Sequence, residues 1–159
     1  LGLIITHKQS NYKKNVSNIR KLILEEKKYK LESKKTYDIF YNKILVLKEK
    51  LNKLIKKILS EKKVIHGYGA STKGNVLLQF FQLNNNMIKY IADRNIKKKN
   101  LFTPGTKIKI VTEKFSRSLK PNYYLVLPWH FKDEILKREK KIRKNGTKFI
   151  FPLPKLIVK

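Results

Sequence analysis

Apolar residues in the N-terminal part of the chain recur at helical spacing. A helical region is expected to begin near Ser17, a candidate N-cap, and to continue toward Leu31. Over residues 34–60 apolar positions alternate three and four apart, with lysine and glutamate between them, which predicts one amphipathic helix about 40 Å long. A second apolar row widens its apolar face, so packing onto the following domain is favoured over a coiled-coil dimer. The apolar run at residues 1–6 predicts a strand.

From residue 62 onward the pattern changes to short apolar runs separated by helical stretches, which is typical of a parallel sheet with helices on its faces. The expected strands cover residues 64–68, 88–92, 107–111, 123–127 and 148–151, and the expected helices cover residues 73–82, 113–118 and 132–144. The predicted fold class is therefore α/β: a Rossmann-like, mostly parallel sheet of about five strands with helices on both faces, preceded by two N-terminal helices. Residues 1–61 are expected to form an N-terminal strand and helical linker region, and residues 62–159 the Rossmann-like domain.

The segment VIHGYGASTKGN, residues 64–75, joins the first expected strand to the helix that follows it. Its glycines, Gly67, Gly69 and Gly74, allow a tight turn and let a diphosphate approach backbone N–H groups at a helix N-terminus. Lys73 adds a cation at the same place. The sequence thus predicts a phosphate-binding loop, and the alternative is a turn whose glycines serve only close packing.

Other residues with chemical potential lie in or after the expected strands. Asp93 follows the second strand, where a Rossmann-type unit carries an acid that accepts a hydrogen bond from a ribose hydroxyl. Trp129 and His130 follow the fourth strand, so they are either cleft residues or a packing motif at the entry of the next helix. His66 lies within the first strand, where a hydrogen-bonded core histidine is the favoured interpretation. Asp133 and Glu134 are expected in the first turn of the last helix, where their negative charge complements the helix dipole.

The chain carries a formal charge of +28, which invites a nucleic-acid interpretation because basic surfaces release counterions from phosphates. Only five of its 39 basic residues are arginine, and the lysines are spread along nearly the whole sequence. Arginine is the preferred bidentate reader of guanine edges and phosphates, so most of these charges are expected on solvated faces and nucleic-acid binding is not favoured. The weaker expectation is that an anionic ligand is attracted and that the attraction falls with salt.

Several classes of site are excluded by composition. The chain contains no cysteine, which excludes disulfides and thiolate metal sites and is compatible with a cytoplasmic location. Three scattered histidines do not make a zinc site, so no metal is expected. No stretch approaches about eighteen continuous apolar residues, so no membrane partner is expected either.

Five motifs occur in order from residue 67 to residue 154: GYGASTKGN, YIADRN, FTPGTKIKIV, PNYYLVLPWHFKDEI and GTKFIFPLP. Together they resemble the C-terminal domain of the sugar-nucleotide C-methyltransferases, a family of S-adenosylmethionine-dependent enzymes. The resemblance is strong over residues 62–154, and the helical stretch before it looks like the linker that precedes this domain. It implies part of an enzyme that adds a methyl group to a carbon of a nucleotide-linked keto-deoxysugar.

The resemblance also limits what is expected of this chain. The family's zinc-binding and S-adenosylmethionine-binding domains have no counterpart here, so S-adenosylmethionine is implied for the full-length enzyme and no cofactor is expected on this chain. No catalytic residue carries over, and the chain is expected to be inactive alone, as a fragment or as a subunit of a split enzyme. The residues that carry over as nucleotide-sugar-binding are Gly67, Tyr68, Gly69, Ala70, Ser71, Lys73, Gly74, Asp93, Pro104, Trp129 and His130.

The expected partners are a nucleotide-linked deoxysugar and, for a split enzyme, a separate chain that carries the S-adenosylmethionine-binding domain. Two alternatives stay open at this point. One is a stand-alone nucleotide-binding or scaffold module without transferase activity, and the other is a basic nucleic-acid-binding protein.

Overall fold

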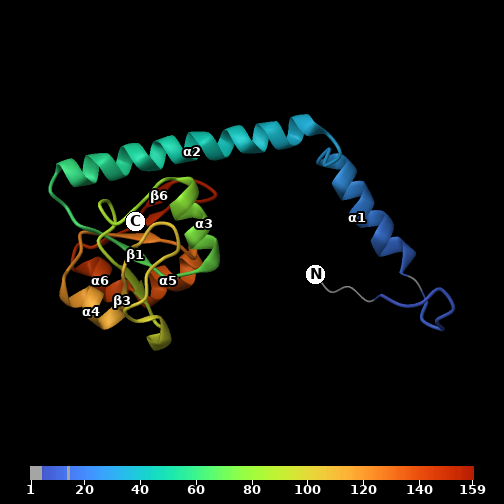
Figure 1. The fold of residues 1–159 in the computed structure, drawn as a ribbon. Coiled ribbons are helices and arrows are strands. Elements are labelled where there is room, and N and C mark those ends of the chain that lie inside the picture. Colours follow the sequence, from blue (N-terminus) through green and yellow to red (C-terminus); the bar gives the residue numbers. More distant parts are fainter. Residues whose placement is uncertain (1–4, 14) are drawn as a thin grey trace. The chain divides into compact units, whose positions relative to one another are not determined.

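The computed structural model describes residues 5–13 and 15–159 and is drawn in Figure 1. Its contacts divide the chain into two compact units, residues 1–43 and 44–159. The division falls inside helix α2 (Lys34–Ser60), whereas the sequence pattern put the boundary after residue 61. The reason is that the C-terminal half of α2 belongs to the core of the second unit, where Leu51, Ile55 and Ile58 are buried.

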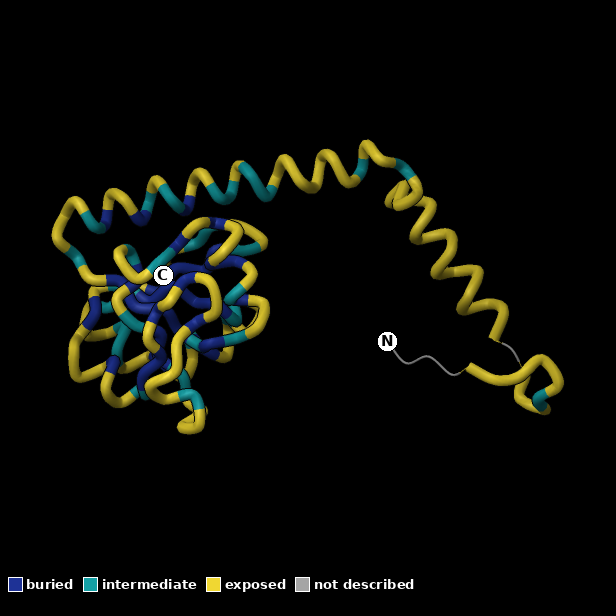
Figure 2. Tube along the Cα trace, viewed as in Figure 1, coloured by how far each residue is buried: buried dark blue, intermediate teal, exposed yellow. Residues whose placement is uncertain are grey.

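The first unit contains helix α1 (Val16–Lys28) and the start of α2. The prediction that Ser17 caps this helix is wrong: Asn15 is the N-cap, because its side-chain oxygen accepts a hydrogen bond of 3.1 Å from the amide of Asn18. Every residue of α1 is exposed, as Figure 2 shows. The strand expected at residues 1–6 falls mainly outside the described residues, and residues 5 and 6 have no regular secondary structure.

The second unit, whose residues are all described, is built on a sheet of six strands in the order β3-β2-β1-β4-β5-β6. The strands are β1 (Ile65–Tyr68), β2 (Ile91–Asp93), β3 (Ile110–Thr112), β4 (Tyr123–Val126), β5 (Lys148–Phe151) and β6 (Ile157–Val158). Neighbours among β1 to β5 pair in parallel, which confirms the expected mostly parallel sheet. β6 pairs antiparallel with β5 and was not predicted, because two residues are too few to show an alternating pattern.

Strands β2 and β3 begin later than the sequence pattern indicated. The amide of Ile88 donates a hydrogen bond of 2.9 Å to the carbonyl of Asn84, so residue 88 closes a turn over residues 85–87 instead of starting a strand. Lys107 has a φ of 52°, a left-handed conformation that a strand does not contain. Ile88 and Ile108 are nevertheless fully buried, so these apolar runs mark core positions that extend beyond the strands themselves.

Helices cover both faces of the sheet, as predicted (Figure 1). They are α3 (Thr72–Phe80), α4 (Glu113–Ser118), α5 (Lys132–Arg138) and α6 (Lys140–Lys144), with short 3-10 helices η1 (Ile96–Lys98) and η2 (Trp129–Phe131). On one face Ile55 of α2 and Leu78 of α3 pack in the same cluster as Leu125 of β4. On the other face Ile135 of α5 packs in a cluster with Phe149 of β5. Within the described residues no helix is long and apolar enough to cross a membrane.

Candidate functional site

A cleft of about 500 Å³ lies at the carboxyl ends of β1, β2 and β4. The strand order reverses between β1 and β4, since β2 and β3 extend the sheet on one side and β5 and β6 on the other. Open α/β sheets bind their ligands in the crevice at this reversal point. The cleft is lined by Tyr68, Gly69, Ala70, Ser71, Asp93, Arg94, Lys98, Glu113, Pro128, Phe131, Glu134, Ile135 and Arg138.

The glycine loop, residues 67–74, brings the chain from β1 into α3 by close packing. Gly69 has a φ of 81°, and a Cβ at this position would lie 2.8 Å from the ring of Pro128. A Cβ on Gly74 would lie 2.5 Å from Cβ of Leu127, so α3 approaches the end of β4 more closely than any side chain permits. These two glycines are therefore required by packing, which is the alternative that the sequence left open.

The backbone amides of the glycine loop are largely engaged within the protein. The amide of Gly69 donates to the carbonyl of Ala92 (2.7 Å), and that of Ser71 donates to the carbonyl of Gly69 (2.9 Å). The amide of Gly74 donates to the side-chain oxygen of Ser71 (3.0 Å), which is the N-cap of α3. A phosphate would have to displace these bonds to use the same donors.

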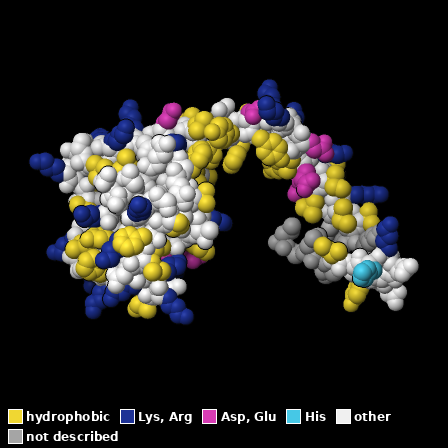
Figure 3. Space-filling model, viewed as in Figure 1, with side chains coloured by type: hydrophobic (Ala, Val, Ile, Leu, Met, Phe, Trp, Pro, Cys, Tyr) yellow, Lys and Arg dark blue, Asp and Glu magenta, His cyan; other side chains and the backbone are white. Residues whose placement is uncertain are grey.

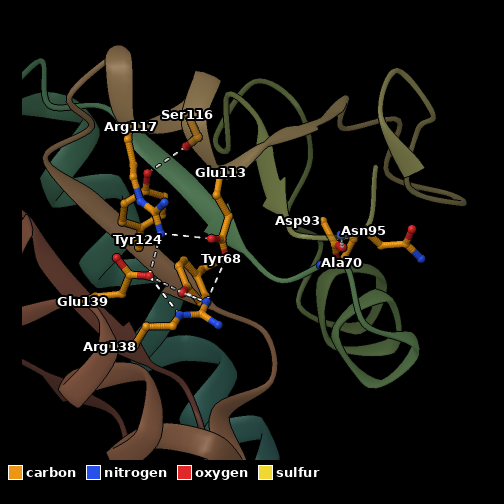
Figure 4. A network of polar contacts seen from close by, with 10 residues as sticks. All are labelled: Tyr68, Ala70, Asp93, Asn95, Glu113, Ser116, Arg117, Tyr124, Arg138 and Glu139. Carbon is orange, nitrogen blue, oxygen red and sulfur yellow. Dashed lines mark hydrogen bonds and ion pairs between the residues drawn. The ribbon is translucent and has the colours of Figure 1, made fainter. Parts of the chain in front are cut away.

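Asp93 fixes the position of the loop. Its Oδ2 accepts a hydrogen bond of 2.7 Å from the amide of Ala70, and its Oδ1 accepts one of 2.7 Å from the amide of Asn95 (Figure 4). Lys98 Nζ lies 3.4 Å from the same Oδ2 and donates to the carbonyl of Ala70 at 2.7 Å. Both carboxylate oxygens are thus occupied by protein donors, so the geometry gives Asp93 a structural role.

A network of charged and phenolic groups, here called the Glu139 network, forms the opposite wall of the cleft and continues behind it: Tyr68, Glu113, Arg117, Arg138 and Glu139. Only 3% of Glu139 is exposed, and its Oε1 accepts hydrogen bonds from the Tyr68 hydroxyl (2.7 Å), Arg117 (2.7 Å) and Arg138 Nε (3.1 Å). Glu113 pairs with Arg117 at 3.0 Å and with Arg138 at 2.8 Å. Figure 4 shows these side chains converging from β1, α4 and the junction of α5 with α6.

The network explains a deviation from the predicted secondary structure. The helix expected over residues 132–144 is divided at Glu139, whose backbone has φ −94° and ψ 20°. This residue also carries the buried carboxylate that receives the three donors, so the interruption coincides with the centre of the network. The helical periodicity of the sequence did not indicate this interruption of the helix.

The environment of Tyr68 keeps its hydroxyl protonated. Burial raises the pKa of Tyr68, and the hydrogen bond to Glu139 raises this pKa further, while the hydrogen bond from Arg138 acts in the opposite direction. The Arg138 guanidinium also contacts the Tyr68 hydroxyl. A phenol held in this state does not act as a base near neutral pH.

The cleft contains five of the residues that the sequence marked as nucleotide-sugar-binding: Tyr68, Gly69, Ala70, Ser71 and Asp93. Six others do not line it: Gly67, Lys73, Gly74, Pro104, Trp129 and His130. Trp129 is partly buried against the clusters on both sheet faces, in agreement with a packing motif at the entry of α5. His130 is exposed, and its ring lies beside that of Phe131 with centroids 4.2 Å apart.

Sequence reasoning missed the charged residues that come to the cleft from later elements. Arg94 had a local signal, because it directly follows Asp93 at the end of β2 and is one of only five arginines. Glu113 and Arg138 had none, since their positions depend on how α4 and α5 pack. Glu134 lines the cleft in addition to its place in the first turn of α5.

His66 occupies the core position that the sequence favoured. It is 1% exposed, and its Nδ1 lies 2.8 Å from Ser116 Oγ, which in turn lies 2.8 Å from the Tyr124 hydroxyl. Burial, and secondarily the charge of Lys89, lowers the pKa of His66 from 6.5 to about 4. Across the described part of the chain, no three His, Asp or Glu side chains gather into a group that could hold a metal ion.

Comparison with known proteins places the chain in a family. The sequence matches the family described as C-methyltransferase C-terminal domain over residues 1–154. It is 29% identical over 136 residues to the C-methyltransferase NovU of Streptomyces niveus, in an alignment that covers 86% of this chain and 32% of the relative. The chain therefore spans less than a third of the length of that relative. The match over residues 1–154 shows that this chain belongs to the family of C-methyltransferase C-terminal domains.

Proposed function

We propose that this chain is the part of a C-methyltransferase that binds a nucleotide-linked keto-deoxysugar. The cleft carries the proposal: it lies where the strand order reverses, it has a volume of about 500 Å³, and charged groups of both signs line it together with Phe131. Membership of the C-methyltransferase family supports methylation at carbon as the reaction of the complete enzyme.

The contribution of such a cleft to catalysis is positional. Methylation beside a ketone requires removal of a proton and placement of the resulting enolate against the methyl donor. Contacts with the nucleotide, remote from the reacting carbon, hold the ketone in place, and their binding energy is used to reach the transition state. The cleft residues therefore bind and orient, and no proton transfer is assigned to them.

S-adenosylmethionine supplies the methyl group in the complete enzyme that the family resemblance implies. Both oxygens of Asp93, the acid that a Rossmann-type site offers to a ribose, are bonded to the protein, so this acid is not expected to hold the ribose of S-adenosylmethionine or that of a nucleotide sugar. No step that involves the methyl donor is assigned to this chain. On this proposal the chain alone binds the sugar nucleotide and does not methylate it.

Isothermal titration calorimetry with deoxythymidine-diphosphate glucose tests the binding function. Saturable binding is expected, and Phe131→Ala should weaken it about five-fold, because the variant removes an exposed aromatic face from the cleft. Phe102→Ala is the matched control, since Phe102 is 60% exposed, compared with 48% for Phe131, but lies outside the cleft. The proposal fails if the chain binds no member of a panel of deoxythymidine-, uridine-, guanosine- and cytidine-diphosphate sugars.

The second part of the proposal is tested by incubating the chain with S-adenosylmethionine and a nucleotide-linked keto-deoxysugar, followed by mass spectrometry. No methylated product is expected. Product formed by the purified chain would show that it contains the catalytic groups after all.

A further inference from the structure

One cation of the cleft has no partner among the residues that the structure describes. Lys98 is bonded to the carbonyl of Ala70 and paired with Asp93, and Arg138 is paired with Glu113 and Glu139. Arg94 lines the same cleft, is exposed, and makes no hydrogen bond or ion pair with any residue in 5–13 or 15–159. Its guanidinium is therefore the lining cation whose donors remain available to a ligand.

Arginine is more frequent among the cations of the cleft than among the basic residues of the chain as a whole. Only five of the 39 basic residues are arginine, yet two of the three cations that line the cleft are Arg94 and Arg138. A general abundance of lysine does not explain two arginines at one site. Arginine differs from lysine in presenting a planar fork of donors that matches two phosphate or carboxylate oxygens at once.

Acidic residues are also frequent around the cleft. Four of the eleven acidic residues lie in the cleft or directly behind it: Asp93, Glu113, Glu134 and Glu139. Three of these acids are paired with Lys98 or Arg138, so the charge of these two cations is already balanced and does not attract anions throughout the cleft. An anionic group is instead favoured at one place, beside the unpaired guanidinium of Arg94.

The glycine loop offers less to a phosphate than its sequence suggested. Gly69, Ala70, Ser71 and Gly74 all donate their amides within the protein, and Lys73 does not line the cleft. Four amides of the loop are thus occupied, whereas the free guanidinium belongs to the side chain that leaves the sheet one residue after Asp93.

We infer that Arg94 is the diphosphate-binding residue of the cleft and sets its preference for nucleoside-diphosphate ligands. This inference rests on the proposed sugar-nucleotide function. In this arrangement the guanidinium binds oxygens of the diphosphate through paired N–H donors, and the sugar and base extend along the remaining lining.

The test compares four variants by calorimetry with deoxythymidine-diphosphate glucose: Arg94→Gln, Arg94→Lys, Lys73→Gln and Lys97→Gln. Arg94→Gln should weaken binding at least ten-fold and reduce its dependence on salt, because a charge-assisted contact is removed. Arg94→Lys should recover part of the loss. Lys73→Gln and the neighbouring Lys97→Gln, which remove one charge each outside the cleft, should stay within about three-fold of the unmodified chain.

The outcomes separate this inference from the proposed function. If the unmodified chain binds and Arg94→Gln binds equally well, the inference is overturned while the function stands. If Lys73→Gln loses the affinity instead, the glycine loop is the anion site and the inference is likewise overturned. If the unmodified chain binds no nucleotide sugar, the function itself fails. An unchanged urea midpoint for Arg94→Gln is expected, since the exposed side chain makes no contact that stabilises the fold.

Discussion

At the scale of single residues, the molecule concentrates its buried charge at one carboxylate. Glu139 lies beneath the cleft and receives hydrogen bonds from Tyr68, Arg117 and Arg138. Removing an acceptor of this kind leaves donors in a partly buried site without a partner, and the cost of that exceeds the net gain of forming the bonds.

Glu139→Gln should therefore destabilise the chain. The two arginines are each 38% exposed and can recover some hydration, so the expected loss is about 2–3 kcal/mol in the free energy of unfolding. Urea unfolding followed by circular dichroism measures it. Glu61→Gln, which breaks the exposed pair with Lys63, is the control and should leave the midpoint unchanged. Equal effects of the two variants would contradict the role given to Glu139.

His66 makes stability depend on pH. The pKa of this buried ring is about 4 in the folded chain, compared with the ordinary value of 6.5 that applies to the unfolded chain. Between pH 4 and pH 6.5 the unfolded chain therefore binds more protons than the folded chain. Stability is therefore fully present above about pH 6.5 and falls as the pH decreases toward 4, by about 2–3 kcal/mol between pH 7 and pH 4.5.

The measurement is urea unfolding at both pH values, and the loss attributable to this ring should disappear in His66→Asn. That variant is expected to be less stable at pH 7, because it leaves space in the core, so only the difference between the two pH values is diagnostic. His130→Asn alters an exposed ring and should retain the pH response of the unmodified chain. A His66→Asn chain with the full response would exclude this residue as its source.

Only some of these residues could be identified from the sequence. Tyr68 and Asp93 were found because they belong to a local strand-turn-helix pattern. Arg94 was missed, although it directly follows Asp93 in the same pattern. Glu113 and Glu139 could not be found in this way, since they meet Tyr68 only through the packing of α4 and α5, and Glu139 lies 71 positions after Tyr68 in the sequence.

At the scale of secondary-structure elements, prediction succeeded where periodicity was long or flanked by clear boundaries. Helix α2 and strand β5 have the bounds that the pattern indicated. It failed where a boundary depended on tertiary contacts, as at the interruption between α5 and α6, and where an element was very short, as in β6. The close approach of α3 to β4 also depends on a tertiary contact. The sequence shows a glycine at residue 74 but not that Leu127 lies opposite it.

Gly74→Ala tests that approach. In an ordinary helix, replacing glycine by alanine stabilises, since glycine costs about 1 kcal/mol there. Here the new Cβ would meet Leu127 at 2.5 Å, so a loss of about 1–3 kcal/mol is expected instead. Urea unfolding gives the sign. Val76→Ala, at a position of α3 that is 65% exposed, serves as control and should change stability little. A stabilised Gly74→Ala chain would mean that the two elements lie further apart.

At the scale of the whole molecule, positive charge is widely distributed. Figure 3 shows lysine and arginine side chains scattered over the face that it presents, without a single basic stripe. A distribution of this kind attracts anions over long range but does not select a nucleic-acid sequence. Three of the five arginines and four of the eleven acidic residues, by contrast, lie in the cleft or directly behind it.

Binding to duplex DNA should therefore be weak, independent of sequence, and lost as salt rises to about 150 mM. Fluorescence anisotropy of labelled duplexes at increasing salt measures this loss. Binding of deoxythymidine-diphosphate glucose should remain detectable under the same conditions. Tight, salt-resistant binding of one DNA sequence would instead support the nucleic-acid alternative.

Trp129 gives the molecule a built-in optical reporter. It is the single tryptophan of the sequence, it packs against the clusters on both faces of the sheet, and it stands one residue after Pro128 and two before Phe131, both of which line the cleft. Its indole emission should therefore shift to longer wavelength when either layer loosens. Occupation of the cleft should change its intensity, so ligand titrations can be followed without any attached dye.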